Sequence, residues 1–175
     1  MDIDLGMLKE MHPELPTMIV VSMRERAALA LQRNGHASGV RLAVEWNRAL
    51  SSAVLSWPEA NLNTMGQHDL NRVTEDGAEA VALAVAHRYR SWRVVRRMQR
   101  RGYADWLLES VQDGVRTLVA FEISGVDKGS VRARLSEKCT QVSRSRNVNE
   151  RWAGVVGFEQ PTAALQVCGT GIDGN

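Results

Sequence analysis

The sequence predicts a mixed α/β (α+β) fold, in which a mixed sheet is flanked by helices. Two segments, residues 74–90 and 130–144, repeat apolar residues at the spacing of an amphipathic helix. Four short runs between and after them are rich in Val, Leu, Ile, Phe and Trp and are broken by turn-forming residues, as strands commonly are. The order predicted for residues 74–160 is therefore helix, three strands, helix and strand, an αβββαβ core.

An N-terminal helix is expected before this core. Residues 1–16 look like a loose arm that Pro16 closes. Ser22 and Glu25 have the spacing of a capping box, in which the serine hydroxyl accepts from the backbone and the glutamate reaches back. Gly35 suits the left-handed position that ends many helices. The helix is therefore predicted to begin at residue 22.

A β-hairpin follows this helix in the prediction. Residues 39–46 alternate apolar and polar side chains, and residues 52–57 form a second apolar run. Residues 58–73 contain Pro, Asn, Gly and Asp, so we expect a loop. The helix and hairpin have too little apolar surface to fold alone, so residues 1–73 are expected to pack against the core.

Each core element has its own local signal. Thr74 is a good N-cap for the first helix, and Ser130 can cap the second. Asp113 and Gly114 form a hairpin turn signal between the second and third strands. The predicted strands are 92–98, 104–108, 117–123 and 152–158, the last reached by a crossover and therefore parallel to its neighbour. Residues 161–175 show no pattern and are expected to be a flexible tail.

Composition limits the classes of function. The chain has 175 residues, enough for one domain with a sizeable core. Its formal net charge is only +2, so any role in binding nucleic acid must rest on local clusters of basic residues. The N-terminus has no apolar signal region, and no apolar run approaches the roughly 20 residues of a membrane span. Cys139 and Cys168 suggest neither a disulfide framework nor a zinc site, so a cytoplasmic protein that does not contact a membrane is expected.

Two carboxylates stand out within the predicted strands. Asp105 opens the second core strand, and Glu122 lies near the end of the third, in the run FEIS. A carboxylate within an apolar strand needs a partner or solvent because its isolated burial is costly. Glu122 can also simply face outward on a half-exposed strand, and Asp105 can be an ordinary turn acid.

This αβββαβ order, with an acid on each of two neighbouring strands, resembles the PD-(D/E)xK, or restriction-endonuclease-like, superfamily. The resemblance covers about half the chain, residues 74–160, and its motif has low specificity. It implies that Asp105 and Glu122 hold Mg²⁺ or Mn²⁺ against a scissile phosphate, with the carbonyl of Ile123 as a third ligand. It also implies a metal-dependent nucleic-acid phosphodiesterase, for example in bacterial defence or DNA processing.

The chain departs from the family pattern at one position. The family normally has a lysine two residues after the second acid, and here Ser124 stands there. A serine hydroxyl carries no positive charge and can only position a water. Some family members take the basic group from the following helix, which offers Lys128 or, as the better candidate, Lys138. Further contributors are expected on the two helices: Gln141 toward substrate, and Glu75 or Glu79 as an outer carboxylate.

An arginine cluster leads directly into Asp105. Four of its members are predicted to bind nucleic-acid phosphates, namely Arg96, Arg97, Arg100 and Arg101. Three nearby aromatic residues can stack on bases if they are exposed, namely Trp92, Tyr103 and Trp106. The alternative is a solvated edge strand, whose charges discourage pairing with another chain, with the aromatic side chains in the core.

Three hypotheses of function follow. The first is the metal-dependent phosphodiesterase, and the second is a catalytically inactive protein of the same fold that acts as a binding or assembly module, with a nucleic acid or a protein as partner. The third is a small-molecule or peptide-binding α+β domain unrelated to nucleases. Ser124 favours the second hypothesis, whereas the pair of acids and the arginines favour the first. The sequence does not indicate the oligomeric state.

Overall fold

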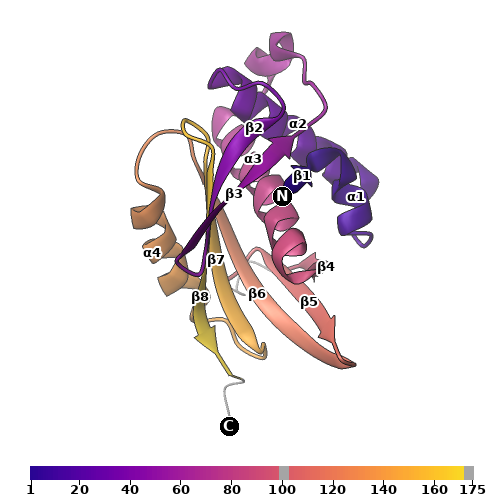
Figure 1. The fold of residues 1–175 in the computed structure, drawn as a ribbon, viewed down its shortest axis with the longest axis vertical. Coiled ribbons are helices and arrows are strands. Elements are labelled where there is room, and N and C mark those ends of the chain that lie inside the picture. Colours follow the sequence, from indigo (N-terminus) through magenta and orange to yellow (C-terminus); the bar gives the residue numbers. More distant parts are fainter. Residues whose placement is uncertain (99–102, 172–175) are drawn as a thin grey trace.

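The computed structural model describes residues 1–98 and 103–171. Eight strands form one mixed sheet in the order β1-β3-β2-β8-β7-β6-β5-β4 (Figure 1). The strands are β1 Asp2–Asp4, β2 Val40–Trp46, β3 Ala49–Ser56, β4 Arg93–Arg97, β5 Trp106–Gln112, β6 Val115–Val126, β7 Glu150–Gly157 and β8 Thr162–Thr170. The helices are α1 Leu8–Met11, α2 Thr17–Arg33, α3 Leu70–Arg90 and α4 Val131–Val142, with short 3-10 turns η1 Leu5–Met7 and η2 Leu62–Gln67.

Helices cover both faces of the sheet. On one face, α3 packs against the strands and α2 packs against α3, around a core that includes Leu83, Phe121 and Trp152. On the other face, α4 lies alone over the middle of the sheet, where Leu135 and Val142 meet Val155 (Figure 1). The expected mixed α/β class, with one mixed sheet flanked by helices, is confirmed.

The element order predicted for the core is also observed: α3, β4, β5, β6, α4 and β7 follow one another. Strands β4, β5 and β6 are antiparallel neighbours, and β6 pairs with β7 in parallel. The helical crossover through α4 therefore gives the parallel pairing that was predicted. Asp113 and Gly114 form the β5–β6 turn, with φ of 51° and 76°, the positive values that a tight hairpin turn needs.

The predicted hairpin forms and belongs to the same sheet as the core. Strands β2 and β3 are antiparallel, and their turn is made by Asn47 and Arg48, both at positive φ. The hairpin joins the core because β2 pairs in parallel with β8. The expectation of a loose N-terminal arm is wrong, because β1 pairs with β3 and Ile3, Leu5 and Leu8 are completely buried.

Both long helices begin earlier than predicted. The N-cap of α2 is Pro16, whose ring cannot continue a helix backward, and Ser22 lies inside the helix. The N-cap of α3 is Asp69, whose carboxylate accepts from the amides of Asn71 and Arg72. Thr74 consequently lies inside the helix, where its hydroxyl donates to the carbonyl of Leu70. Ser130, by contrast, caps α4 as predicted by accepting from the amide of Ala133.

The expected flexible tail is wrong for residues 162–170. They form β8, which lies between β2 and β7 and joins the two halves of the sheet. Ala163, Ala164 and Leu165 are buried there. None of the helices within residues 1–98 and 103–171 is long and apolar enough to cross a membrane.

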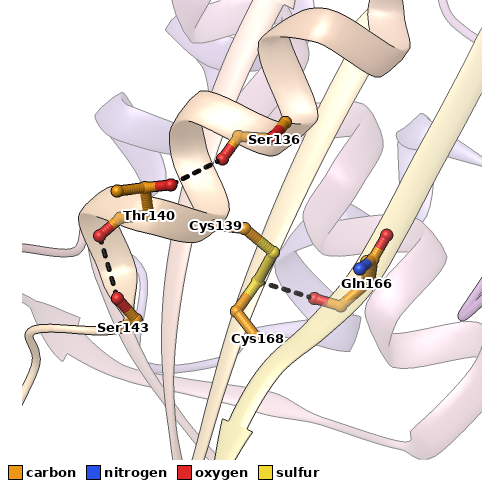
Figure 2. The surroundings of a disulfide bond; sticks show 6 residues. All are labelled: Ser136, Cys139, Thr140, Ser143, Gln166 and Cys168. Atoms are coloured by element: carbon orange, nitrogen blue, oxygen red, sulfur yellow. Dashed lines mark hydrogen bonds between the residues drawn. A yellow bond between two sulfur atoms is a disulfide. The ribbon is translucent and has the colours of Figure 1, made fainter.

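A disulfide joins Cys139 of α4 to Cys168 of β8, contrary to the expectation from sequence (Figure 2). The two Cα atoms lie 5.2 Å apart although 29 residues separate them in the chain. They meet because β8 runs beneath α4, and the sequence pattern did not predict β8. Only Leu135 and Val142 of α4 are buried, so the disulfide supplements a thin apolar contact.

Candidate active site

Asp105 and Glu122 come together where β5 begins, beside the interior of β6. The register pairs Trp106 with Phe121, and the amide of Asp105 donates to the carbonyl of Phe121 over 3.1 Å. The same register puts Asp105 opposite Glu122. The Asp105 carboxylate accepts from the amide of Ile123 over 2.8 Å, which fixes its position against β6.

Both carboxylates line one cavity of about 390 Å³. Among the described residues, Arg97, Met98, Tyr103, Ala104 and Gln141 also line it. Strand β6 and the segment just before β5 therefore supply the acids. Helix α4 supplies an amide, β4 supplies a basic side chain, and the segment before β5 also supplies an aromatic one. The two acids converge on one solvent-reachable space.

Glu122 is 2% exposed and is paired with Lys138. The Lys138 ammonium donates to Glu122 Oε1 over 2.5 Å and also reaches Gln141 Oε1 at 3.4 Å. Burial and, after it, the charge of Asp105 together raise the pKa of Glu122 to about 7, although Lys138 opposes the rise. Glu122 is therefore a carboxylate that takes up a proton near neutral pH unless a stronger cation compensates its charge.

Glu79 of α3 adds a third acid close to this point. It is 6% exposed, and the Arg97 guanidinium donates to its carboxylate over 2.6 Å. Burial raises the pKa of Glu79 to about 7, Arg97 opposes this, and the nearby charge of Asp105 contributes to the rise. Of the two glutamates expected as an outer carboxylate, Glu79 is thus the one near Asp105.

Ser124 does not line the cavity that holds the two acids. Its hydroxyl donates to Glu75 over 3.1 Å and accepts from the Arg134 guanidinium over 3.0 Å. Glu75 also accepts from the amide of Gly125 over 3.0 Å. The position of the family lysine is therefore used here to join β6 to α3 and α4.

The two candidate lysines lie in different places. Lys138 reaches Glu122, as described above, whereas Lys128 is exposed and lines a separate pocket with Thr74 and Glu75. Lys138 is thus the lysine that α4 brings to the pair of acids. The disulfide holds α4 at Cys139, the residue next to Lys138 (Figure 2).

The arginine run is only partly available for a ligand. A β-bulge between Val94 and Arg96 shifts the register and sets Arg97 opposite Trp106. The Arg97 guanidinium lies 4.4 Å from the centre of the Trp106 ring while it also pairs with Glu79. Arg96 is exposed and pairs with no acid among residues 1–98 and 103–171. Arg100 and Arg101 lie outside the described residues.

The three nearby aromatic residues differ in exposure. Trp92 and Trp106 are 3% and 2% exposed, so both belong to the core and neither can stack on a base. Tyr103 is 45% exposed and lines the cavity with the two acids.

Sequence reasoning missed the pairing of Glu79 with Arg97 and the disulfide. A signal for the first was present, because Glu79 is the single charged residue between Ala78 and Ala86 in an otherwise apolar stretch of helix. A lone acid on a buried helix face requires a cationic partner. The disulfide gave no such signal, because the two cysteines lie in segments whose proximity depends on β8.

Comparison of the chain with protein-family models, with characterised proteins and with solved structures found no match. Inferences about function therefore rest on the geometry of the site alone.

Proposed function

We propose that the chain is a metal-dependent nucleic-acid phosphodiesterase of the PD-(D/E)xK kind, with Asp105 and Glu122 as ligands of Mg²⁺ or Mn²⁺. One observation carries the proposal: two carboxylates from neighbouring strands line one cavity, and a lysine ammonium from the following helix reaches one of them. Two ionised carboxylates that face each other from neighbouring segments repel, and a shared divalent cation would relieve this repulsion.

The donor set fits a hard divalent cation. Mg²⁺ is commonly bound through one or two carboxylates, with waters and substrate phosphate oxygens completing its shell. No group of three or more His, Cys, Asp and Glu side chains suited to a metal occurs within residues 1–98 and 103–171, so two carboxylates must suffice. A divalent cation would also compensate the buried charge of Glu122 more fully than one ammonium does.

The bound cation would neutralise charge on the scissile phosphate and lower the pKa of an attacking water. In this proposal Lys138 orients that water, since it is the partly buried cation that pairs with Glu122. Ser124 is not assigned this role because Glu75 and Arg134 engage its hydroxyl. Gln141 contacts substrate from the rim of the cavity, and Arg96 and Arg97 contact the phosphate backbone.

The test is cleavage of end-labelled single- and double-stranded DNA and RNA in Mg²⁺ or Mn²⁺, with EDTA as the blank. Glu122→Gln and Asp105→Asn should each lower the rate by at least about 100-fold, the scale on which removal of a central electrostatic group acts. Glu137→Gln is the matched control on α4, where its carboxylate is exposed and pairs with Arg134, and it should cleave at the wild-type rate.

A second candidate is a catalytically inactive binding module. It is favoured by the internal ion pairs, because Lys138 neutralises Glu122 and Arg97 neutralises Glu79 within the protein itself. Absence of cleavage on all four substrates, together with absence of Mn²⁺ binding, would decide for this candidate. The cytoplasmic location stays a prediction, and the disulfide argues against a permanently reducing compartment.

A further inference from the structure

Tyr103 is an exposed aromatic residue beside the two acids. It is 45% exposed, whereas Trp92 and Trp106, the other two aromatic residues of this region, are buried. It lies two residues before Asp105 and lines the cavity that holds Asp105 and Glu122. The exposed ring is therefore accessible to a molecule that enters this cavity.

The backbone at Tyr103 is held in an unfavourable conformation. Its φ is +54°, in the left-handed region, which bulky residues rarely adopt. Such conformations cost on the order of 1–3 kcal/mol and cluster at active sites and ligand clamps. A glycine or asparagine would adopt this backbone conformation with less strain, so a tyrosine at this position has a local cost in folding free energy.

A cation accompanies the ring. The guanidinium of Arg144, which follows α4, lies 5.9 Å from the centre of the Tyr103 ring, and its side chain is exposed. An aromatic face beside an exposed arginine is the combination that single-strand binding sites use, where bases stack on the ring and the cation contacts the backbone. Tyr103 lines the cavity with the acids that are proposed to face the scissile phosphate, and the Arg144 guanidinium lies over its ring.

We infer that Tyr103 is a stacking platform for one unpaired base beside the scissile phosphate, so that the site takes single-stranded nucleic acid and discriminates against intact duplex. The inference rests on the proposed phosphodiesterase function. A base within a duplex has both faces covered by its neighbours, so only an unstacked base can offer a face to Tyr103. Arg144 then contacts the adjoining phosphate.

Binding tests this directly in the full wild-type chain with EDTA present, which prevents turnover. The probe is a 15-residue oligothymidylate with one central 2-aminopurine, whose fluorescence falls when it stacks. Tyr103→Gly removes the ring and relieves the backbone strain, and it should weaken binding about tenfold or more, the lower part of the range for loss of one stacked base. Tyr103→Phe should bind within about twofold of wild type, and both wild type and Tyr103→Phe should quench the fluorescence.

Two controls make the result interpretable if a variant folds poorly. Tyr103→Leu keeps an apolar side chain without a stacking face and should behave like Tyr103→Gly. On the ligand side, moving a single abasic nucleotide along the strand should reveal one position where the wild-type chain loses about tenfold in affinity. A duplex of the same sequence should bind equally to wild type and to Tyr103→Gly.

Different results would overturn the stacking role of Tyr103 and the proposed phosphodiesterase. Metal-dependent cleavage that is as fast on duplex as on single strands, with Tyr103→Gly unchanged in binding and quenching, would overturn the stacking role and leave the phosphodiesterase intact. Absence of cleavage on every substrate would overturn the phosphodiesterase. The quenching and abasic measurements would still decide whether Tyr103 stacks a base.

Discussion

Removal of Lys138 should destabilise the protein at high pH much more than at low pH. Lys138→Met keeps most of the side-chain volume but leaves Glu122, of which only 3% of the side chain is exposed, without its cation. Removing one partner of a buried ion pair usually costs about 3–5 kcal/mol, because the remaining charge stays buried. Glu122 can avoid much of this cost by taking up a proton, and the extent depends on pH.

The pKa of Glu122 sets the range of pH over which the stability changes. In the folded wild type it is about 7, above its ordinary value of 4.5, so the folded state binds more protons between these values and stability falls as pH rises through them. Without Lys138 the folded pKa rises further. A further rise of one to two units corresponds to about 1.4–2.7 kcal/mol of additional destabilisation above that pKa. Near pH 5 the Glu122 carboxyl is protonated in both wild type and Lys138→Met, so its charge no longer contributes to the difference in their free energies of unfolding.

Urea unfolding at pH 5 and pH 8.5 measures the difference. Relative to wild type, the free energy of unfolding of Lys138→Met should fall by on the order of 2 kcal/mol more at pH 8.5 than at pH 5. Lys128→Met, the exposed control, should unfold with the wild-type free energy at both pH values. The double variant Glu122→Gln with Lys138→Met should lose this pH dependence. Equal destabilisation of Lys138→Met at both pH values would refute the argument, because the cost would then be packing alone.

Three further predictions follow from contacts outside the cavity. His12 is buried, accepts from the amide of Val94 and contacts the carbonyl of Leu83. Burial lowers its pKa to about 4, below the ordinary 6.5. The free energy of unfolding should therefore fall by up to about 3 kcal/mol as pH falls from 6.5 to 4. The difference in urea stability between wild type and His12→Gln should shrink by that amount over this window. Cys139→Ser should cost about 3–4 kcal/mol by the loop-entropy relation and speed amide exchange in α4, and an unchanged urea midpoint would show that the disulfide contributes nothing. Gly125→Ala would drive a Cβ into the Thr74 carbonyl oxygen and should cost about 3 kcal/mol in thermal unfolding, whereas Gly66→Ala, which meets nothing within 4 Å, should change stability by less than about 0.5 kcal/mol.

The core could be predicted from the sequence because its signals are local. Helical periodicity, apolar runs and the Asp113-Gly114 turn each act within a few residues. The convergence of the two acids follows from the same turn: Asp105 lies eight residues before Asp113, and Glu122 lies eight residues after Gly114. In a two-residue hairpin without a bulge, residues equally distant from the turn are opposite each other.

The remaining features depend on contacts between distant segments. Strand β8 mixes small, polar and apolar residues without a clear alternation, and hydrogen bonds to strands on both sides stabilise it. The pairing of Arg97 with Glu79 depends on a bulge in β4 that changes which side Arg97 faces, and no local pattern announces that bulge. The disulfide depends in turn on β8, so one unpredicted strand accounts for two of the differences.

The central claim is that Asp105 and Glu122 share a divalent cation. The most direct measurement is a crystal structure of the protein in Mn²⁺, with anomalous scattering to locate the ion. We predict one peak in the cavity, with oxygens of both carboxylates at about 2.0–2.3 Å, and no such peak in crystals of Glu122→Gln. An empty cavity in the wild type at millimolar Mn²⁺, with the Lys138–Glu122 pair intact, would contradict the claim.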